Sequence, residues 1–317
     1  AGTTLLSGNS THTGTTTVTS GTLRLGAAGT SPNSPLGTTA PGTTVSSGAV
    51  LDLNGFTLAT AEGLTLNGTG ISGGALINSG AAATYSGAVT LASNSSIGTT
   101  GNITLSGVVS GAGISLTKVG AGSLILSGNN TYSGTTTISS GTLAISAAER
   151  ITNSSNIILN GGTFSTGVST GFTETVGTLS LQNNSTIALG TGNHTLTFAA
   201  SNAVSWASST VLTITGWTGT INCGAGTAGK IFVGSASTAL TAAQLSQIKF
   251  TISGVDYPAT LLSTGQLVPT LKLVVTNPGN QYDGVPFNVT VTATDFNGAP
   301  ITLTATTQVY GVEFSPN

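Results

Sequence analysis

The side chains of this 317-residue chain that could perform acid–base or metal chemistry are few and widely separated. The acids are Asp52, Glu62, Glu149, Glu174, Asp256, Asp283, Asp295 and Glu313. A polysaccharide lyase or hydrolase needs clustered carboxylates, basic residues or a metal. No two of the acids form a pair close in sequence, although stacking of a repetitive chain could still bring two together. We therefore predict no catalytic, cofactor-binding or metal-binding residue, and a protein that is not an enzyme.

Two further groups could bind protons or metal ions. His12 and His194 are isolated in sequence, so we expect surface imidazoles rather than catalytic ones. Asp283 and Asp295 lie in or near turns and could share a calcium ion, since carboxylate and carbonyl oxygens suit that ion. Two acids are a small ligand set, so the interpretation as ordinary turn residues is favoured.

The single cysteine and the two tryptophans also allow a structural and a functional interpretation. Cys223 cannot form an internal disulfide, and burial as a small apolar residue is favoured over pairing between chains. Trp206 and Trp217 could stack on sugar rings. Their apolar neighbours, among them Val204 and Ile214, favour a role in the core.

Hydroxyl and amide side chains are abundant. The threonine triplets 15–17 and 135–137 could present a flat hydroxyl array, such as an ice-binding face. The triplet does not recur in every intervening segment, so we favour β-branched strands with hydrated, outward-facing hydroxyls. The sequons that begin at Asn102 and Asn184 leave glycan attachment open.

The composition excludes several classes of protein. Charged residues make up 4% of the chain, against about 25% in an ordinary soluble domain. The six basic residues are too scattered to bind nucleic acid or an anionic membrane. No apolar run approaches the ~20 residues of a spanning helix, and the positive mean hydropathy argues against disorder. Because the chain starts at Ala1 and lacks methionine, we expect a processed, exported protein.

The chain is repetitive. Residues 6–26, LSGNSTHTGTTTVTSGTLRLG, return as residues 126–146, LSGNNTYSGTTTISSGTLAIS, with 13 of 21 positions identical. Three glycines recur, Gly8, Gly14 and Gly21 as Gly128, Gly134 and Gly141, as corners with positive φ or close backbone approach would require. The repeat therefore preserves a local backbone shape and not a set of reactive side chains.

Short apolar pairs two residues apart, such as Leu51/Leu53 and Ile103/Leu105, predict short strands with one inward face. A sandwich would give each strand a different context, whereas this chain reuses one, which favours a parallel β-helix (β-solenoid). Leu23, Leu25, Leu143 and Ile145 should then point inward. With ~20 to 25 residues per coil, residues 1–265 would form about a dozen coils and a rod of about 55 Å.

The end of the solenoid is marked by one helical signal. Thr241 and Gln244 have capping-box spacing, Leu240, Leu245 and Ile248 form an apolar side, and Lys249 suits the C-terminal end of a helix. We predict a solenoid over residues 1–267, with a terminal cap near 239–267 that covers its last coil.

The sequence pattern changes after residue 268. Candidate strands lie at 271–275, 287–293, 301–306 and 309–314, with turn signals between them. An immunoglobulin-like sandwich needs about 7 strands, so residues 268–317 are predicted to be a small, antiparallel and incomplete immunoglobulin-like unit.

Residues 122–136, GSLILSGNNTYSGTT, resemble the autotransporter-associated β-strand repeat, also called the passenger-associated transport repeat. The first copy departs from that pattern with Ser10 and His12 in place of Asn130 and Tyr132. LTAAQLSQIKF with TGQLVP resembles the closing region of secreted bacterial proteins with these repeats, and GVPFNVTVTATDFNGAP resembles bacterial surface immunoglobulin-like modules. The resemblance implies a parallel β-helix, bacterial export and a cell-surface or extracellular location, but no substrate.

Two interpretations of function follow. In the first, the chain is a structural subunit or segment of an extracellular, cell-surface fibre, a homopolymer in which rods meet end to end and the partial C-terminal unit receives a strand from its neighbour. A net charge of -2 permits such self-association. In the second, it is a spacer or passenger segment of a large bacterial adhesin, with possible cell-surface or glycan contact. Neither requires a cofactor, nucleic acid or a membrane-spanning segment.

Overall fold

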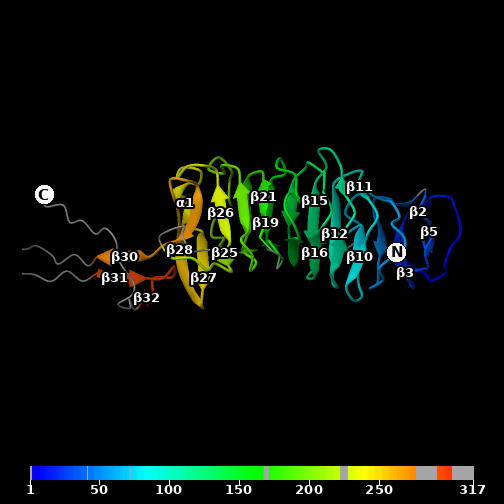
Figure 1. The fold of residues 1–317 in the computed structure, drawn as a ribbon, viewed down its shortest axis with the longest axis horizontal. Coiled ribbons are helices and arrows are strands. Elements are labelled where there is room, and N and C mark those ends of the chain that lie inside the picture. The colour runs from blue at the N-terminus through cyan, green and yellow to red at the C-terminus, as the bar shows by residue number, and fades with distance from the viewer. Residues whose placement is uncertain are drawn as a thin grey trace, which may run out of the picture.

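The computed structural model describes residues 2–40, 42–71, 73–167, 171–221, 228–275 and 291–301. Within these ranges the chain winds into an elongated stack of β-coils, and the coils follow one another along the rod in sequence order (Figure 1). Every pairing between successive coils is parallel until the last few strands. The predicted parallel β-solenoid is therefore confirmed.

Each coil contributes strands to up to three faces of the rod. The first face is a nine-stranded parallel sheet. In spatial order it contains β1 (Thr3–Leu6), β3 (Gly21–Leu25), β7 (Ala49–Asp52), β9 (Leu76–Asn78), β12 (Ser95–Thr99), β15 (Leu116–Val119), β17 (Thr136–Ile138), β19 (Ile157–Asn160) and β22 (Leu179–Asn183).

The second face follows the first along the chain in each complete coil. It contains β10 (Ala83–Tyr85), β13 (Ile103–Leu105), β16 (Ser123–Leu126), β18 (Thr142–Ile145), β20 (Thr163–Ser165), β23 (Ser185–Ala188), β25 (Leu212–Thr215) and β27 (Ile248–Ile252).

The third face has two separate runs of strands. The first run contains β2 (Thr16–Val18), β6 (Thr43–Val45), β8 (Leu64–Leu66), β11 (Val89–Leu91) and β14 (Val109–Ser110). The second run contains β21 (Thr173–Val176), β24 (Thr195–Phe198) and β26 (Lys230–Val233). Two coils separate the runs, and side chains bridge this gap.

The coils are fewer than the predicted dozen, since nine strands stack on the first face. In the middle of the rod the coil length matches the expectation, and Leu116, Thr136 and Ile157 occupy equivalent places 20 and 21 residues apart. Near the N-terminus Leu23 lies opposite Leu51, 28 residues later. The hairpin of β4 (Asn33–Ser34) and β5 (Gly37–Thr38) is inserted there, so the longer coil lowers the number of coils.

The core is a set of in-register columns of apolar side chains. One column on the second face runs through eight consecutive strands, and every member is at most 3% exposed. Its members are Ala83, Ile103, Leu124, Leu143, Phe164, Ile187, Ile214 and Phe250. Each large buried side chain contributes about 1.5–3 kcal/mol through the hydrophobic effect, so the column stabilises every coil against its neighbours.

The inward orientation predicted for the four repeat residues is confirmed. Leu25, Leu143 and Ile145 are fully buried. Leu23 lies in register with the buried Leu51 and packs against the core, although it is only partly buried.

The recurring glycines differ between the two copies because their steric constraint comes from the preceding coil. Gly21 and Gly141 both have positive φ, and a Cβ atom would lie 2.6 Å from Gly2 O or 2.3 Å from Gly120 O. At Gly134 a Cβ would lie 2.3 Å from the backbone of Ile114, whereas Gly14 has no atom within 4 Å. The prediction of positive φ or close approach therefore holds for all three glycines of the second copy and for Gly21, but not for Gly8 or Gly14.

The predicted capping box is present in the short helix α1 (Ala242–Leu245). The Gln244 side chain also donates from Nε2 to the carbonyls of Ser201 and Val204, at 2.9 and 2.8 Å, and so fixes the helix on the last coils. The prediction for Lys249 is wrong. The helix ends four residues earlier, and Lys249 lies in β27, where Nζ is 2.6 Å from Asp256 Oδ2.

After the helix the strand direction reverses. β27 pairs antiparallel with β28 (Val255–Leu261), β28 with β29 (Gln266–Pro269), and β29 with β26. These antiparallel strands hydrogen-bond to both β25 and β26, which belong to the last parallel coils. No helix in the described part of the chain is long and apolar enough to cross a membrane.

A small antiparallel sheet follows at the C-terminal end of the rod (Figure 1). It consists of β30 (Lys272–Val275), β31 (Val291–Thr294) and β32 (Pro300–Ile301). The Phe296 N–H donates to Asp256 O at 2.7 Å and so contacts β28. The predicted strand at 309–314 and nearly all of 301–306 lie outside the described residues, and the immunoglobulin-like character of this unit stays a prediction.

Candidate functional site: buried polar groups and the open N-terminal coil

Glu149 is exposed, whereas the other described acids bind to the protein itself. Asp52 is fully buried, and its Oδ2 is 2.8 Å from Arg24 Nε and accepts from the Ser79 hydroxyl at 2.7 Å. Its Oδ1 accepts from the backbone N–H groups of Asn54 and Ser79. Glu62 accepts from the hydroxyls of Thr43 and Ser34, at 2.6 and 3.2 Å, and burial raises its pKa. These carboxylates therefore join neighbouring coils.

Glu174 lies beside the part of the third face, between β14 and β21, that has no strand. Its side chain helps to bridge this gap. Its carboxylate is fully buried and accepts from the backbone N–H groups of Arg150 and Ile151, at 2.8 and 2.7 Å. Burial raises its pKa to about 7, against the lowering effect of these two hydrogen bonds.

Asn130 completes the bridge on the other side. Its amide accepts from the Val109 N–H at 2.8 Å and donates to Arg150 O at 2.7 Å. The side chains of Asn130 and Glu174 thus complement the Thr131 N–H, which donates to Val109 O, and the Thr152 hydroxyl, which donates to Tyr132 O, between β14 and β21. Backbone groups would otherwise be left unpaired there.

Lys118 occupies a place in an otherwise aliphatic column of the first face. It lies in register between Ile97 and Ile138 and is fully buried. Nζ donates to the carbonyls of Val119, Gly120 and Ser140, at 2.8, 2.7 and 3.2 Å. Burial lowers its pKa to about 8. By donating to these three backbone carbonyls, the ammonium group of Lys118 joins the corners of two neighbouring coils.

The histidines do not share the predicted surface location. His12 is exposed and hydrogen-bonds through Nδ1 to Ser10 Oγ at 3.0 Å and through Nε2 to Thr16 Oγ1 at 2.8 Å. The prediction is wrong for His194, which is fully buried, has neither ring nitrogen hydrogen-bonded and packs edge-on against Phe172 at 4.5 Å. Burial lowers its pKa, so this ring is held in its neutral form.

The core role of the tryptophans is supported. Trp217 is 4% exposed and packs edge-on against Phe250, with ring centroids 5.2 Å apart. Trp206 is partly buried against the core and donates from Nε1 to Leu179 O at 3.0 Å. The burial of Trp217 leaves its ring without a face for a sugar.

The threonine triplets are not equivalent hydrated surfaces. Thr136 is fully buried, and its hydroxyl lies 2.9 Å from both Tyr132 Oη and Ser155 Oγ, so the predicted outward hydration is wrong at this position. Extended hydroxyl columns do exist elsewhere, and only the strand register reveals them. Five strands of the third face align Thr17, Thr44, Thr65, Thr90 and Ser110, and five of the second align Ser123, Thr142, Thr163, Thr186 and Thr213.

Metal ligands do not gather in the part of the chain that the structure describes, where no three His, Cys, Asp or Glu side chains form a cluster. Asp295 is a turn residue that accepts through Oδ1 from the N–H groups of Asn297 and Ala299, at 2.9 and 2.8 Å. Cys223, Asp283 and Glu313 lie outside the described residues.

The two sequence copies form the same local unit on different faces of the rod. In the first copy β2 lies on the third face and β3 on the first, whereas in the second copy β17 lies on the first and β18 on the second. The motif therefore encodes a strand, a glycine corner and a strand, and not a fixed face.

The family model of the passenger-associated-transport repeat matches residues 1–25 and 116–145, which cover these two units. The chain carries the passenger-associated-transport repeat. The searches of curated proteins and of solved structures found no match.

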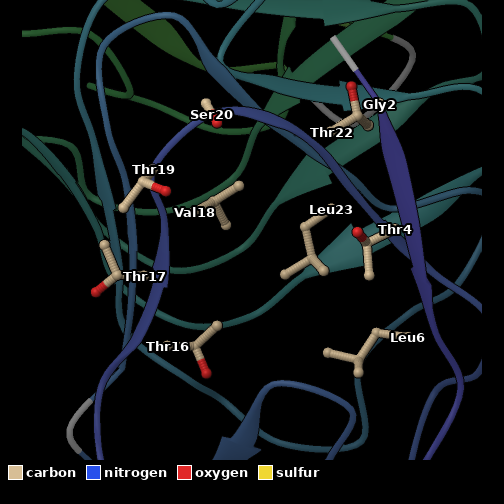
Figure 2. A pocket seen from close by; sticks show the side chains of 10 residues that line it. All are labelled: Gly2, Thr4, Leu6, Thr16, Thr17, Val18, Thr19, Ser20, Thr22 and Leu23. Carbon is tan, nitrogen blue, oxygen red and sulfur yellow. The ribbon is translucent and has the colours of Figure 1, made fainter.

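The passenger repeat of the first copy lies at the N-terminal end of the described rod. β1 is the outermost described strand of the first face, and β2 is the outermost described strand of this run of the third face. A hollow of about 250 Å³ lies between them. Figure 2 shows that Val18 and Leu23 project into it beside Leu6. Only uncharged residues line it: Gly2, Thr4, Leu6, Thr16–Ser20, Thr22 and Leu23.

Proposed function

We propose that this chain is a non-enzymatic structural segment of an extracellular or cell-surface bacterial fibre, assembled end to end. The observation that carries the proposal is the unbroken apolar column from Ala83 to Phe250, because in-register stacking of this kind produces length and stiffness. The passenger-associated-transport repeat and the β-solenoid fit a segment of a secreted or surface passenger.

The small number of charged side chains, several of which are held inside the rod, supports a structural role. The buried charges Asp52, Glu174 and Lys118 have their partners within the rod, and Lys249 pairs with Asp256. A robust turnover of any member of a polysaccharide panel, abolished by one acidic substitution, would contradict this part of the proposal.

The C-terminal sheet is the proposed assembly element. Among the described residues β30 and β32 are its two outer strands, and an outer strand can accept a strand from another chain. We propose that a neighbouring copy completes this sheet by strand addition. The contact would extend the rod along its own axis, since the sheet lies at the end of the rod (Figure 1).

Electron microscopy of the purified chain tests the proposal directly. We expect filaments from the 317-residue chain and isolated rods after deletion of residues 301–317. Circular dichroism and the thermal midpoint of the rods control for folding. Filaments of unchanged length after the deletion would remove strand addition at this end as the mechanism.

A spacer or passenger segment of a large adhesin is the second candidate, favoured by the regular, almost uncharged exterior formed by the hydroxyl columns. The mass of the natural polypeptide separates the two candidates. A mass near 30.8 kDa supports a polymerising subunit, and a far larger mass supports an adhesin.

A further inference from the structure

Some asparagines of this chain precede a glycine, and such an asparagine can lose its side-chain amide without an enzyme. The glycine has no side chain to shield its nitrogen, so that nitrogen can reach the asparagine amide. Whether a pair reacts depends on how firmly the fold holds the two reacting groups. The sequence contains four such pairs: Asn54-Gly55, Asn67-Gly68, Asn160-Gly161 and Asn297-Gly298.

The reaction joins the glycine nitrogen to the asparagine Cγ. The nitrogen gives up its proton and attacks, a cyclic imide forms, and Nδ2 leaves with that proton as ammonia. Water then opens the ring at either carbonyl, which gives aspartate or isoaspartate. Two hydrogen bonds slow the attack, because one from the glycine N–H fixes the attacking nitrogen and one from Nδ2 fixes the side-chain amide.

Asn54 is held at both groups by the coils on its two sides. The Gly55 N–H donates to Asn78 Oδ1 in the following coil at 2.7 Å. Asn54 Nδ2 donates to Leu25 O in the preceding coil at 2.9 Å. Attack at this pair therefore requires two hydrogen bonds between coils to break.

Asn67 is held in the same way. The Gly68 N–H donates to Ser93 Oγ in the following coil at 2.9 Å. Asn67 Nδ2 donates to Val45 O in the preceding coil at 3.1 Å. The two pairs thus have equivalent protection although they lie at different corners.

Asn297 is held by its own turn and by the end of the solenoid. The Gly298 N–H donates to Asp295 O at 3.1 Å. The Asn297 side chain hydrogen-bonds to the carboxylate of Asp256 in β28. Both groups of this pair are therefore restrained as well.

Asn160 has only one of the two restraints. It ends β19 in the middle of the rod, beside a shift in register between β19 and β22 (Figure 1). The Gly161 N–H donates to Ser185 Oγ of the following coil at 2.9 Å. Ser185 is 6% exposed and donates to Asn183 O, so its hydroxyl is fixed. The Asn160 side chain is exposed and makes no hydrogen bond within the described part of the chain.

We propose that Asn160 is the residue at which this chain deamidates first, and that Ser185 controls the rate by holding the Gly161 N–H. Isoaspartate at this position would add a methylene group to the main chain at the corner between Leu159 and Phe164, which are both fully buried. Deamidation would therefore loosen the stacking of this coil. The inference goes beyond the proposed function and does not depend on assembly, because Asn160 and Ser185 lie within one rod.

Ageing of the folded full-length chain at mildly alkaline pH, followed by pepsin digestion and mass spectrometry, tests the order of reaction. We expect conversion at Asn160 to be about two- to twelvefold faster than at Asn54 or Asn67, as the loss of one hydrogen bond implies. In concentrated urea the pairs should react at similar rates, since the protection comes from the fold. Equal rates in the folded chain, or faster conversion at Asn54 or Asn67, would overturn the proposal.

Ser185→Ala tests the role of the serine because it removes the acceptor of the Gly161 N–H. Conversion at Asn160 should rise about two- to twelvefold, while the rates at the other pairs stay unchanged. The matched control is Ser165→Ala, which removes a similar bond from the Gly167 N–H at 3.1 Å and should leave the rate at Asn160 unaltered. An unchanged rate at Asn160 in Ser185→Ala would show that this hydrogen bond does not control the reaction.

Asn160→Gln gives a readout that does not depend on Ser185. Glutamine keeps the amide, but its longer side chain closes an imide ring far more slowly. The thermal midpoint of the parent should fall during ageing, and that of Asn160→Gln should fall less. An equal fall in both proteins would contradict the loosening of this coil by deamidation at Asn160.

Discussion

The Tyr132 hydroxyl lies 2.9 Å from the Thr136 hydroxyl inside the rod, and the first repeat reproduces this contact with His12 Nε2 at 2.8 Å from Thr16 Oγ1. The ring and the threonine are four residues apart in both copies. Tyr132 is fully buried by the preceding coil, whereas His12 is exposed. The same local hydrogen bond therefore forms in a buried environment and in an exposed one.

Tyr132→Phe should destabilise the protein by about 0.5–1.5 kcal/mol, because the ring stays in place and one buried hydrogen bond is lost. The cost stays moderate because Thr136 keeps Ser155 as a partner. His12→Phe at the exposed site should change the free energy of unfolding by less than about 0.5 kcal/mol. Urea denaturation of both variants measures the difference, and equal effects would show that burial of the ring does not matter.

Glu174→Gln should remove part of the pH dependence of stability. In the folded protein burial raises the pKa of Glu174 from 4.5 to about 7, so between these values the folded state binds more protons than the unfolded state. The contribution of Glu174 to the free energy of unfolding is fully present below pH 4.5. It is lost as the pH rises through about 7, and the total loss is up to about 3 kcal/mol.

The measurement is the free energy of unfolding between pH 4 and 8, parent against variant. The N–H groups of Arg150 and Ile151 donate to different oxygens of Glu174, so glutamine keeps only one of the two acceptors, and the titration is removed. The variant should therefore show a flatter curve, and the test is the slope with pH. Glu62, whose pKa is also raised by burial, leaves a residual slope of the same sign. A parent curve that rises between pH 4.5 and 7 would contradict this assignment.

Lys118 gives a pH effect in the alkaline range. Burial lowers its pKa to about 8, so between pH 8 and 10.5 the unfolded state binds more protons and the stability of the parent should rise with pH. Lys118→Met keeps the length of the side chain within the column of Ile97 and Ile138 and should abolish that rise.

Lys118→Ala is the matched control for packing. It removes the same charge as the methionine variant but leaves a cavity, so it should be less stable than Lys118→Met by about 2–5 kcal/mol. Thermal unfolding at pH 7 compares the two. Equal stabilities would mean that the aliphatic part of Lys118 does not fill the column.

The sequence was sufficient to predict the columns, because pairs such as Ile103/Leu105 repeat at period two and the same strand–corner–strand unit recurs. It was also sufficient for the capping box of α1, whose two residues are close in sequence. These features depend on residues that are close in sequence, and successive coils repeat the strand pattern along the rod.

Features that depend on contacts between coils could not be predicted in this way. Lys118 resembles a surface residue until the three carbonyls around Nζ are in place. Glu174 receives its partners from a coil 24 and 23 residues earlier, and no pattern near it marks the strandless stretch that it bridges. The number of coils was overestimated because the hairpin before Leu51 lengthens one of them.

Gly134→Ala and Gly14→Ala form a matched pair at equivalent places in the two repeats. At Gly134 the added methyl group would lie 2.3 Å from the carbonyl carbon of Ile114 in the preceding coil, so backbone must move and the cost should be about 1–3 kcal/mol. At Gly14 nothing lies within 4 Å and φ is not positive, so alanine should be neutral or stabilise by up to about 1 kcal/mol through the unfolded state. Chemical denaturation of the monomeric rods measures both. A large loss at Gly14 would show that this corner is as closely packed as the corner at Gly134.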